Sequence, residues 1–129
     1  MARDLEGSSV KTILLVDDEY SIIEVLAYLL EEEGFAVLTA SNGRAALDRA
    51  AEKVPDLVVT DQMMPVMTGA ELLAALRKSA ALQHVPVILM TSAPLAATRQ
   101  LRWDDFISKP FAFSELLQAV RRVLPKSEE

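Results

Sequence analysis

The stretch Lys11–Tyr20, KTILLVDDEY, sets an apolar run directly against a run of carboxylates. Residues 13–16 have the length and unbroken hydrophobicity of a strand that is covered on both faces. Asp17, Asp18 and Glu19 follow at once. Because adjacent like charges repel one another, we expect a compensating cation at the end of this strand.

The same kind of segment recurs along the chain and alternates with helical segments. Four further short apolar runs occupy residues 35–39, 57–60, 87–90 and 105–108. Apolar residues at helical spacing occupy 21–33, 43–53, 70–79, 94–102 and 114–124, of which 94–102 is the shortest and weakest pattern. Parallel strands need crossover connections, so this alternation predicts one α/β domain: a doubly wound sheet of five parallel strands with about five helices on its two faces.

Composition limits the class of protein. The chain has 129 residues, a net charge of −6 and a pI near 4.8, which argues against direct contact with nucleic acid. It has no cysteine, and no apolar run approaches the roughly 20 residues of a membrane span. Without a signal-peptide pattern, we expect a cytoplasmic domain over 11–124, with polar tails at 1–10 and 125–129.

Function in open parallel sheets is found at the carboxyl ends of the strands. The residues expected at that edge are Asp17, Asp18, Asp61, Thr91 and Lys109. Each has an ordinary interpretation when taken alone, as a helix cap, a turn residue or a surface lysine. Three convergent carboxylates favour a magnesium site, and a nucleophilic carboxylate beside a hydroxyl and a cation suits a phosphoryl group.

Several other residues are given structural rather than functional interpretations. His84 has no partner in the sequence and is predicted to be a solvated loop residue. Whether the Lys109–Pro110 bond is cis or trans stays open, since only about 5–6% of X–Pro bonds are cis. Gly34 is expected to cap one helix C-terminally and Ser114 another N-terminally. Packing roles are predicted for four methionines, Met63, Met64, Met67 and Met90.

Five stretches carry a resemblance to a known family. They are ILLVDDE (13–19), SNGRAAL (41–47), PDLVVTDQMMPVMTG (55–69), MTS (90–92) and FISKPF (106–111). In this order they resemble the receiver domain of bacterial two-component response regulators, including single-domain chemotaxis regulators, over roughly residues 11–124. The resemblance implies a flavodoxin-like sheet with strand order 2-1-3-4-5.

The resemblance also implies roles for individual residues. Asp61 would accept a phosphoryl group from the phosphohistidine of a sensor histidine kinase or phosphotransfer protein, and an unknown downstream protein would respond. Asp18, Asp61 and the backbone carbonyl of Met63 would ligate Mg²⁺, with Asp17 acting through water. Thr91 and Lys109 would bind phosphoryl oxygens. Phe106 would be the aromatic switch residue that turns inward on activation.

Two departures from the family pattern stand out. The stretch from Thr91 to Lys109 is about one helical turn shorter than in most receivers, which predicts a short or reshaped fourth helix. RWDD at 102–105 stands where the family usually has GADD, so Trp103 replaces a small residue. The family commonly uses the face of the fourth helix, fifth strand and fifth helix for output and dimers, so the oligomeric state of this chain stays open.

Competing functions are weaker on chemical grounds. A magnesium phosphatase of the DxDxT type is not matched here, because Asp17-Asp18-Glu19-Tyr20 has no second aspartate at the required offset. A flavodoxin would place a flavin phosphate against three carboxylates, which would repel it. A pure docking module has no need of the full site. We therefore expect a signalling domain rather than an enzyme, acting alone, as a phosphotransfer shuttle, or as a fragment of a longer regulator.

Overall fold

Five parallel strands form one sheet in the computed structural model, which describes residues 10–92 and 103–124. The strands are β1 (Thr12–Val16), β2 (Ala36–Ala40), β3 (Leu57–Asp61), β4 (Val87–Thr91) and β5 (Asp105–Ser108). Their order across the sheet is β2-β1-β3-β4-β5, all neighbours being parallel. This confirms the flavodoxin-like order and the strand assignments, with β2 displaced by one residue from its predicted position.

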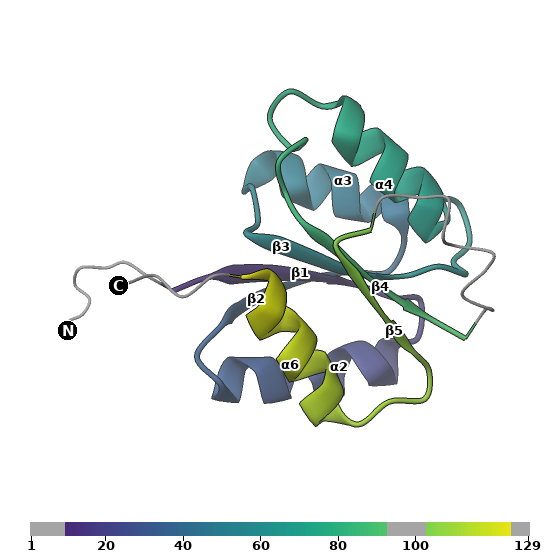
Figure 1. The fold of residues 1–129 in the computed structure, drawn as a ribbon. Coiled ribbons are helices and arrows are strands. Elements are labelled where there is room, and N and C mark those ends of the chain that lie inside the picture. Colours follow the sequence, from purple (N-terminus) through teal and green to yellow (C-terminus); the bar gives the residue numbers. More distant parts are fainter. Residues whose placement is uncertain (1–9, 93–102, 125–129) are drawn as a thin grey trace.

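Helices cover both faces of the sheet (Figure 1). Helices α3 (Gly43–Glu52) and α4 (Gly69–Lys78) lie on one face, and α2 (Tyr20–Glu32) and α6 (Phe113–Val123) on the other. The helix predicted over 94–102 lies outside the described residues, as do 1–9 and 125–129 of the predicted tails. None of the helices within the described ranges is long and apolar enough to cross a membrane.

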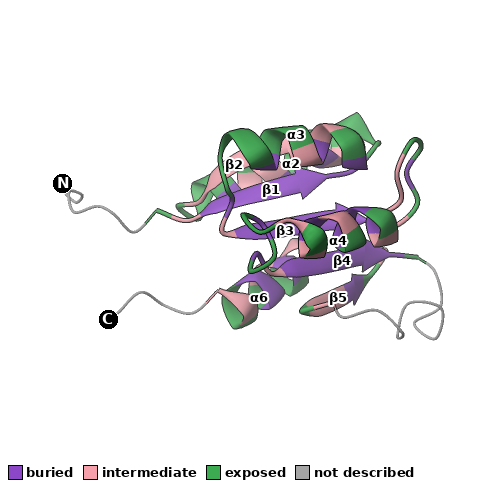
Figure 2. Cartoon of the chain, turned by 90° about the horizontal axis from the view of Figure 1, so that it is seen from above, coloured by how far each residue is buried: buried purple, intermediate pink, exposed green. Residues whose placement is uncertain are grey.

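The central strands are buried along their whole length (Figure 2). Successive side chains of a strand point to opposite faces, so β1 supplies both halves of the core. Leu14 and Val16 belong to the cluster beneath α3 and α4, and Ile13 and Leu15 to the cluster beneath α2 and α6. A sheet packed on both sides explains why the strand segments show no polar alternation.

Helix ends show where local prediction works and where it fails. Gly34 follows the end of α2 with φ of +99°, so the predicted C-terminal glycine is confirmed. The Ser114 prediction is wrong, because α6 begins at Phe113 and its N-cap is Ala112. The Glu115 carboxylate instead accepts a hydrogen bond from the Ala112 amide at 2.8 Å. A side chain reaching back to the N-cap amide thus replaces the usual hydroxyl cap.

Candidate functional site

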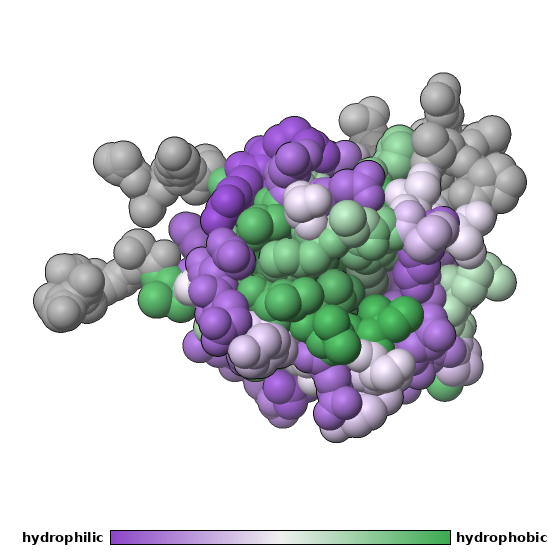
Figure 3. All heavy atoms as spheres, turned by 90° about the horizontal axis from the view of Figure 1, so that it is seen from below, coloured by the Kyte–Doolittle hydropathy of each residue, from purple (hydrophilic) through white to green (hydrophobic). Residues whose placement is uncertain are grey.

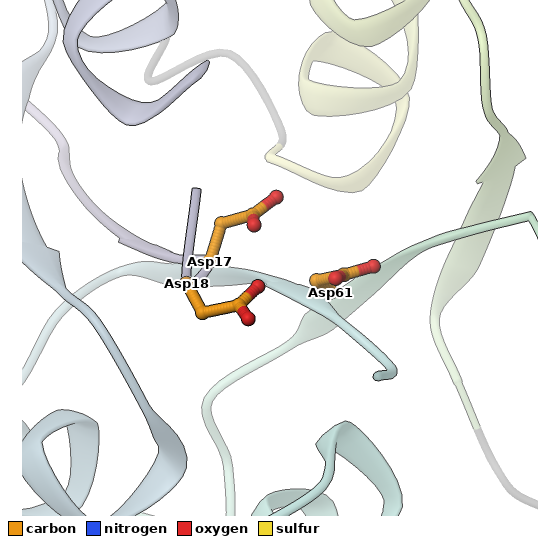
Figure 4. A group of neighbouring side chains, drawn as sticks. All are labelled: Asp17, Asp18 and Asp61. Atoms are coloured by element: carbon orange, nitrogen blue, oxygen red, sulfur yellow. The ribbon is translucent and has the colours of Figure 1, made fainter. Parts of the chain in front are cut away.

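Three carboxylates meet at the carboxyl edge of the sheet (Figure 4). Asp61 is the last residue of β3, and Asp17 and Asp18 follow β1, the neighbouring strand. Ligand oxygens of the three lie within 4.8 Å of one another. Asp17 is 1% and Asp61 7% exposed, whereas Asp18 is exposed. The convergence expected from the order of strand ends is therefore present.

Lys109 supplies the positive charge that this cluster needs. Its ammonium lies 3.1 Å from Asp17 and 3.2 Å from Asp61, and 4.0 Å from the exposed Glu19. The Asp17 carboxylate also accepts a hydrogen bond from the Glu19 amide at 2.9 Å. One cation facing three clustered carboxylates leaves a surplus of negative charge, which favours a further cation at this edge.

Ionisation of the site reflects the balance of burial and pairing. Burial raises the pKa of Asp61 above its ordinary value, although the charge of Lys109 opposes this and that of Asp17 adds to it. For Lys109, burial lowers the pKa, but the hydrogen bond and charge of Asp17 and the charge of Asp61 outweigh it, so the pKa is raised. Lys109 is therefore held as a cation, and Asp61 is costly to ionise without one.

The donor set fits a small hard cation. Magnesium prefers oxygen ligands and is commonly held by one or two carboxylates together with waters and phosphate oxygens. Asp17, Asp18 and Asp61 present that chemistry, with no nitrogen or sulfur donor among them. The Met63 side chain is 67% exposed, so its predicted packing role is wrong. Met64 and Met90 are buried and Met67 is partly buried against the core, as predicted.

The other predicted site residues lie at the ends of β4 and β5. Thr91 ends β4 and is fully buried, and its carbonyl accepts a hydrogen bond from the Lys109 amide at 2.9 Å. Phe106 is half-buried in β5. The Lys109–Pro110 bond, left open by the sequence, is cis. His84 is exposed, as predicted.

The RWDD stretch anchors the start of β5. Trp103 is partly buried against the core cluster of the α3 and α4 face. Asp104 accepts hydrogen bonds from the Val87 amide at 2.7 Å and from Arg77 of α4 at 3.2 Å. Arg77 also donates to the Val85 carbonyl at 2.8 Å. Arg77 and Asp104 thus link α4 to the start of β4 and β5, while Trp103, the residue that departs from the family pattern, packs against the core.

Two residues that sequence reasoning missed tie the loop after Asp61 to the site. The Gln62 carbonyl accepts from the Gly69 amide at 3.0 Å, and its side chain accepts from the Ala70 amide at 2.9 Å. A Cβ on Gly69 would lie 2.5 Å from the Asp61 carbonyl oxygen, so only glycine fits there. This role of Gly69 was not predicted, because the close approach depends on how the loop packs against the end of β3.

An apolar hollow opens beside Lys109 on the face of α2 and α6. Figure 3 shows apolar side chains gathered on this face of the molecule. A cavity of about 580 Å³ lies there, next to the acidic cluster. Its lining comes from the start of α2 and from the ends of β4 and β5: Ser21, Ile22, Val25, Leu26, Ser92, Lys109, Pro110 and Phe111.

A flavodoxin-like sheet with a lysine-paired acidic cluster at its carboxyl edge defines a class of phosphoryl-accepting signalling domains. Residues 13–121 match the family described as the response regulator receiver domain, and the chain belongs to that family. The chain is therefore a receiver domain of the two-component type, and its sheet has the strand order that the resemblance implied.

Individual relatives support the assignment. The chain is 38% identical over 122 residues to the alkaline phosphatase synthesis transcriptional regulatory protein PhoP of Bacillus subtilis, and 39% identical over 119 residues to the transcriptional regulatory protein CpxR of Escherichia coli. These matches cover 92% and 89% of this chain but 50% of each relative, so the chain spans about half their length. Among solved structures, the chemotaxis response regulator CheY4 of Vibrio cholerae superimposes with a TM-score of 0.84 at 32% identity, covering 90% of this chain and 100% of CheY4.

Proposed function

We propose that Asp61 accepts a phosphoryl group from the phosphohistidine of a sensor histidine kinase or phosphotransfer protein. The observation that carries the proposal is the pairing of Asp61 with Lys109 at 3.2 Å inside a three-carboxylate cluster. A buried carboxylate beside a fixed cation is a competent nucleophile for phosphorus, and its product would remain paired with the same cation.

The transfer is a displacement at phosphorus. A carboxylate oxygen of Asp61 attacks, an O–P bond forms, and the P–N bond to the donor imidazole breaks. The electron pair of that bond goes to the imidazole nitrogen, which leaves as neutral histidine after taking up a proton. Lys109, whose ammonium lies 3.2 Å from the Asp61 carboxylate, would pair with the phosphoryl oxygens as they gain charge. Magnesium held by Asp18, Asp61 and the Met63 carbonyl, with Asp17 acting through water, would neutralise charge on the phosphoryl oxygens.

The switch is proposed to run through Thr91 and Phe106. Thr91 ends the strand next to Asp61, and its hydroxyl is the proposed donor to a phosphoryl oxygen. Movement of Thr91 would make room for the half-buried ring of Phe106, on the adjacent strand β5. Trp103 emission should change on adding beryllofluoride with Mg²⁺, and an equal change in Thr91→Ala would exclude the hydroxyl as the coupling group.

The setting of this activity is proposed as follows. The donor protein would contact the cavity beside Lys109, whose apolar lining provides a contact surface next to Asp61. The domain would act in the cytoplasm as a signalling module, not as a turnover enzyme, and its acidic character disfavours direct nucleic-acid contact by this chain. We also propose that the domain spans residues 11–124 and that a downstream protein responds to it. It would act as a phosphotransfer shuttle or as part of a longer regulator.

A small phosphodonor tests the proposal without any partner protein. Acetyl phosphate with Mg²⁺ should add one phosphoryl group to the wild-type chain, as measured by intact mass, and chelation of the metal should prevent it. Asp61→Asn should take up none while keeping its circular dichroism spectrum. A docking-only receiver would show no uptake in the wild type, and uptake retained in Asp61→Asn would place the acceptor elsewhere.

A further inference from the structure

The N-terminus of α4 is held by the residue that follows Asp61. The Gln62 carbonyl accepts a hydrogen bond from the Gly69 amide at 3.0 Å, and the Gln62 side chain accepts one from the Ala70 amide at 2.9 Å. Both amides are among those that a helix leaves without an intrahelical partner at its start. Because Gln62 and Ala70 are eight residues apart, these bonds join the end of β3 to the start of α4.

Capping of the helix does not by itself account for Gln62. Thr68 and Glu71 already form a capping box at the first turn of α4. A cap normally comes from residues that border the helix, as these two do. Gln62 instead reaches the helix from the other end of the loop, from the position next to the proposed acceptor. Its side chain therefore links α4 to the site as well as capping it.

The start of α4 lies directly against the backbone of Asp61. A Cβ on Gly69 would lie 2.5 Å from the Asp61 carbonyl oxygen and 3.0 Å from the side-chain oxygen of Gln62. This contact leaves no room for the helix to move toward β3, and the bond from the Ala70 amide to Gln62 opposes movement away from it. The positions of α4 and of Asp61 are thus coupled.

Met63 depends on this coupling for its position. Its backbone carbonyl is the proposed magnesium ligand, but its side chain is 67% exposed and belongs to neither core cluster. On one side of it, Met64 is buried in the core, and on the other, Gln62 is bonded to α4. Within the described part of the chain, the backbone of Met63 is therefore fixed through its two neighbours.

We propose that Gln62 is a positioning residue for magnesium binding: its side chain ties α4 to the end of β3 and so fixes the backbone carbonyl of Met63. The inference rests on the proposed function, in which that carbonyl is a metal ligand. A ligand that is already held in place loses less conformational freedom when the ion binds, which raises affinity. Groups that orient metal ligands typically change metal affinity or activity about 10–100-fold when they are removed.

Gln62→Met tests the proposal, because it removes the acceptor and keeps an unbranched side chain of similar length. In the metal-free variant the Ala70 amide should exchange its hydrogen faster than in the wild type. The variant should bind Mg²⁺ at least about tenfold more weakly, as measured by NMR shifts near Asp61. With acetyl phosphate, its phosphorylation rate should be low at limiting Mg²⁺ and should return to the wild-type rate at saturating Mg²⁺.

Two further variants separate this role from helix stability and from the loss of the glutamine as such. Thr68→Ala removes a different hydrogen bond at the same helix terminus, from the Glu71 amide, and should leave Mg²⁺ affinity close to that of the wild type. Gln62→Glu keeps an oxygen acceptor for the Ala70 amide, and its added negative charge attracts a cation. Its Mg²⁺ affinity should therefore be no lower than that of the wild type.

The outcomes distinguish the inference from the function on which it rests. Wild-type Mg²⁺ affinity in Gln62→Met, an equal loss in Thr68→Ala, or a loss in Gln62→Glu would overturn the inference. A Gln62→Met rate that stays low at saturating Mg²⁺ would overturn it as well, because Gln62 would then act on Asp61 rather than on a metal ligand. A wild-type chain that acetyl phosphate does not phosphorylate in the presence of Mg²⁺ would instead overturn the proposed function.

Discussion

Burial of Asp61 disfavours the ionised carboxylate, which is the form that would act as the nucleophile. Burial raises its pKa above the ordinary value of 3.8, despite the nearby ammonium of Lys109. A carboxyl with a raised pKa binds more protons in the folded than in the unfolded chain, so its ionisation lowers stability as pH rises above the ordinary value. The ionised carboxylate of Asp61 is thus destabilised by burial in the folded protein, and a bound cation would stabilise it.

Asp61→Asn should therefore stabilise the metal-free protein, by an amount that grows with pH. Near pH 4 the two proteins should unfold at similar urea concentrations, and by pH 7 the variant should be the more stable. Urea titrations in chelator at several pH values make the measurement. Asp48→Asn, which removes an exposed carboxylate of α3, is the matched control for the loss of one negative charge. A variant less stable than the wild type at pH 7 would contradict this account of Asp61.

Asp18 offers the clearest test of the metal assignment. It is exposed and makes no ion pair among those of the described residues, so Asp18→Asn should leave the fold unchanged. Magnesium affinity should fall by at least about tenfold, the lower range for altering groups around a metal. Titration followed by NMR shifts near Asp61 measures it, with the neighbouring Glu19→Gln as the matched control. Equal affinities in Asp18→Asn and wild type would remove Asp18 from the site.

At the scale of elements, a helix cap shows what the structure adds to the sequence. Thr68 accepts a hydrogen bond from the Glu71 amide at 3.1 Å, and Glu71 accepts one from the Thr68 amide at 2.8 Å. This capping box fixes the start of α4 and so the end of the loop that follows Asp61.

Thr68→Ala should lower the free energy of unfolding by about 1 kcal/mol. Ser114→Ala is the matched control, because Ser114 lies inside α6 and caps nothing. It should change stability by less than about 0.5 kcal/mol. Chemical denaturation measures the free energy of unfolding of both variants. An equal loss in the two would show that the capping box adds no stability.

Long-range features of the elements were predictable, and local exceptions were not. Continuous apolar runs located every strand because a sheet covered on both faces needs them, as in β1 and β3. The positive φ of Val66 and the exposure of Met63 escaped prediction, since valine ordinarily avoids that conformation and methionine ordinarily packs. The N-terminus of α6 was misplaced because a glutamate took over the capping role of a hydroxyl.

At the scale of the whole molecule, strand order brings the site together. Asp17 and Asp61 are far apart in sequence but end adjacent strands, and Lys109 follows the strand beyond β4. The meeting of Asp17, Asp61 and Lys109 was therefore predictable from the order of the segments, through the rule that function lies at the carboxyl edge. The ion-pair distances and the anchoring of the loop by Gln62 were not, because they depend on side-chain packing.

The most direct measurement identifies the phosphorylated residue chemically. Wild-type protein treated with acetyl phosphate and Mg²⁺ is reduced with sodium borohydride, which converts an aspartyl phosphate into homoserine, and is then digested and sequenced by mass spectrometry. The account predicts homoserine at position 61, and none there when magnesium is chelated. Homoserine at Asp17 or Asp18, or phosphate uptake that leaves Asp61 as aspartate after reduction, would contradict the central claim that Asp61 is the acceptor.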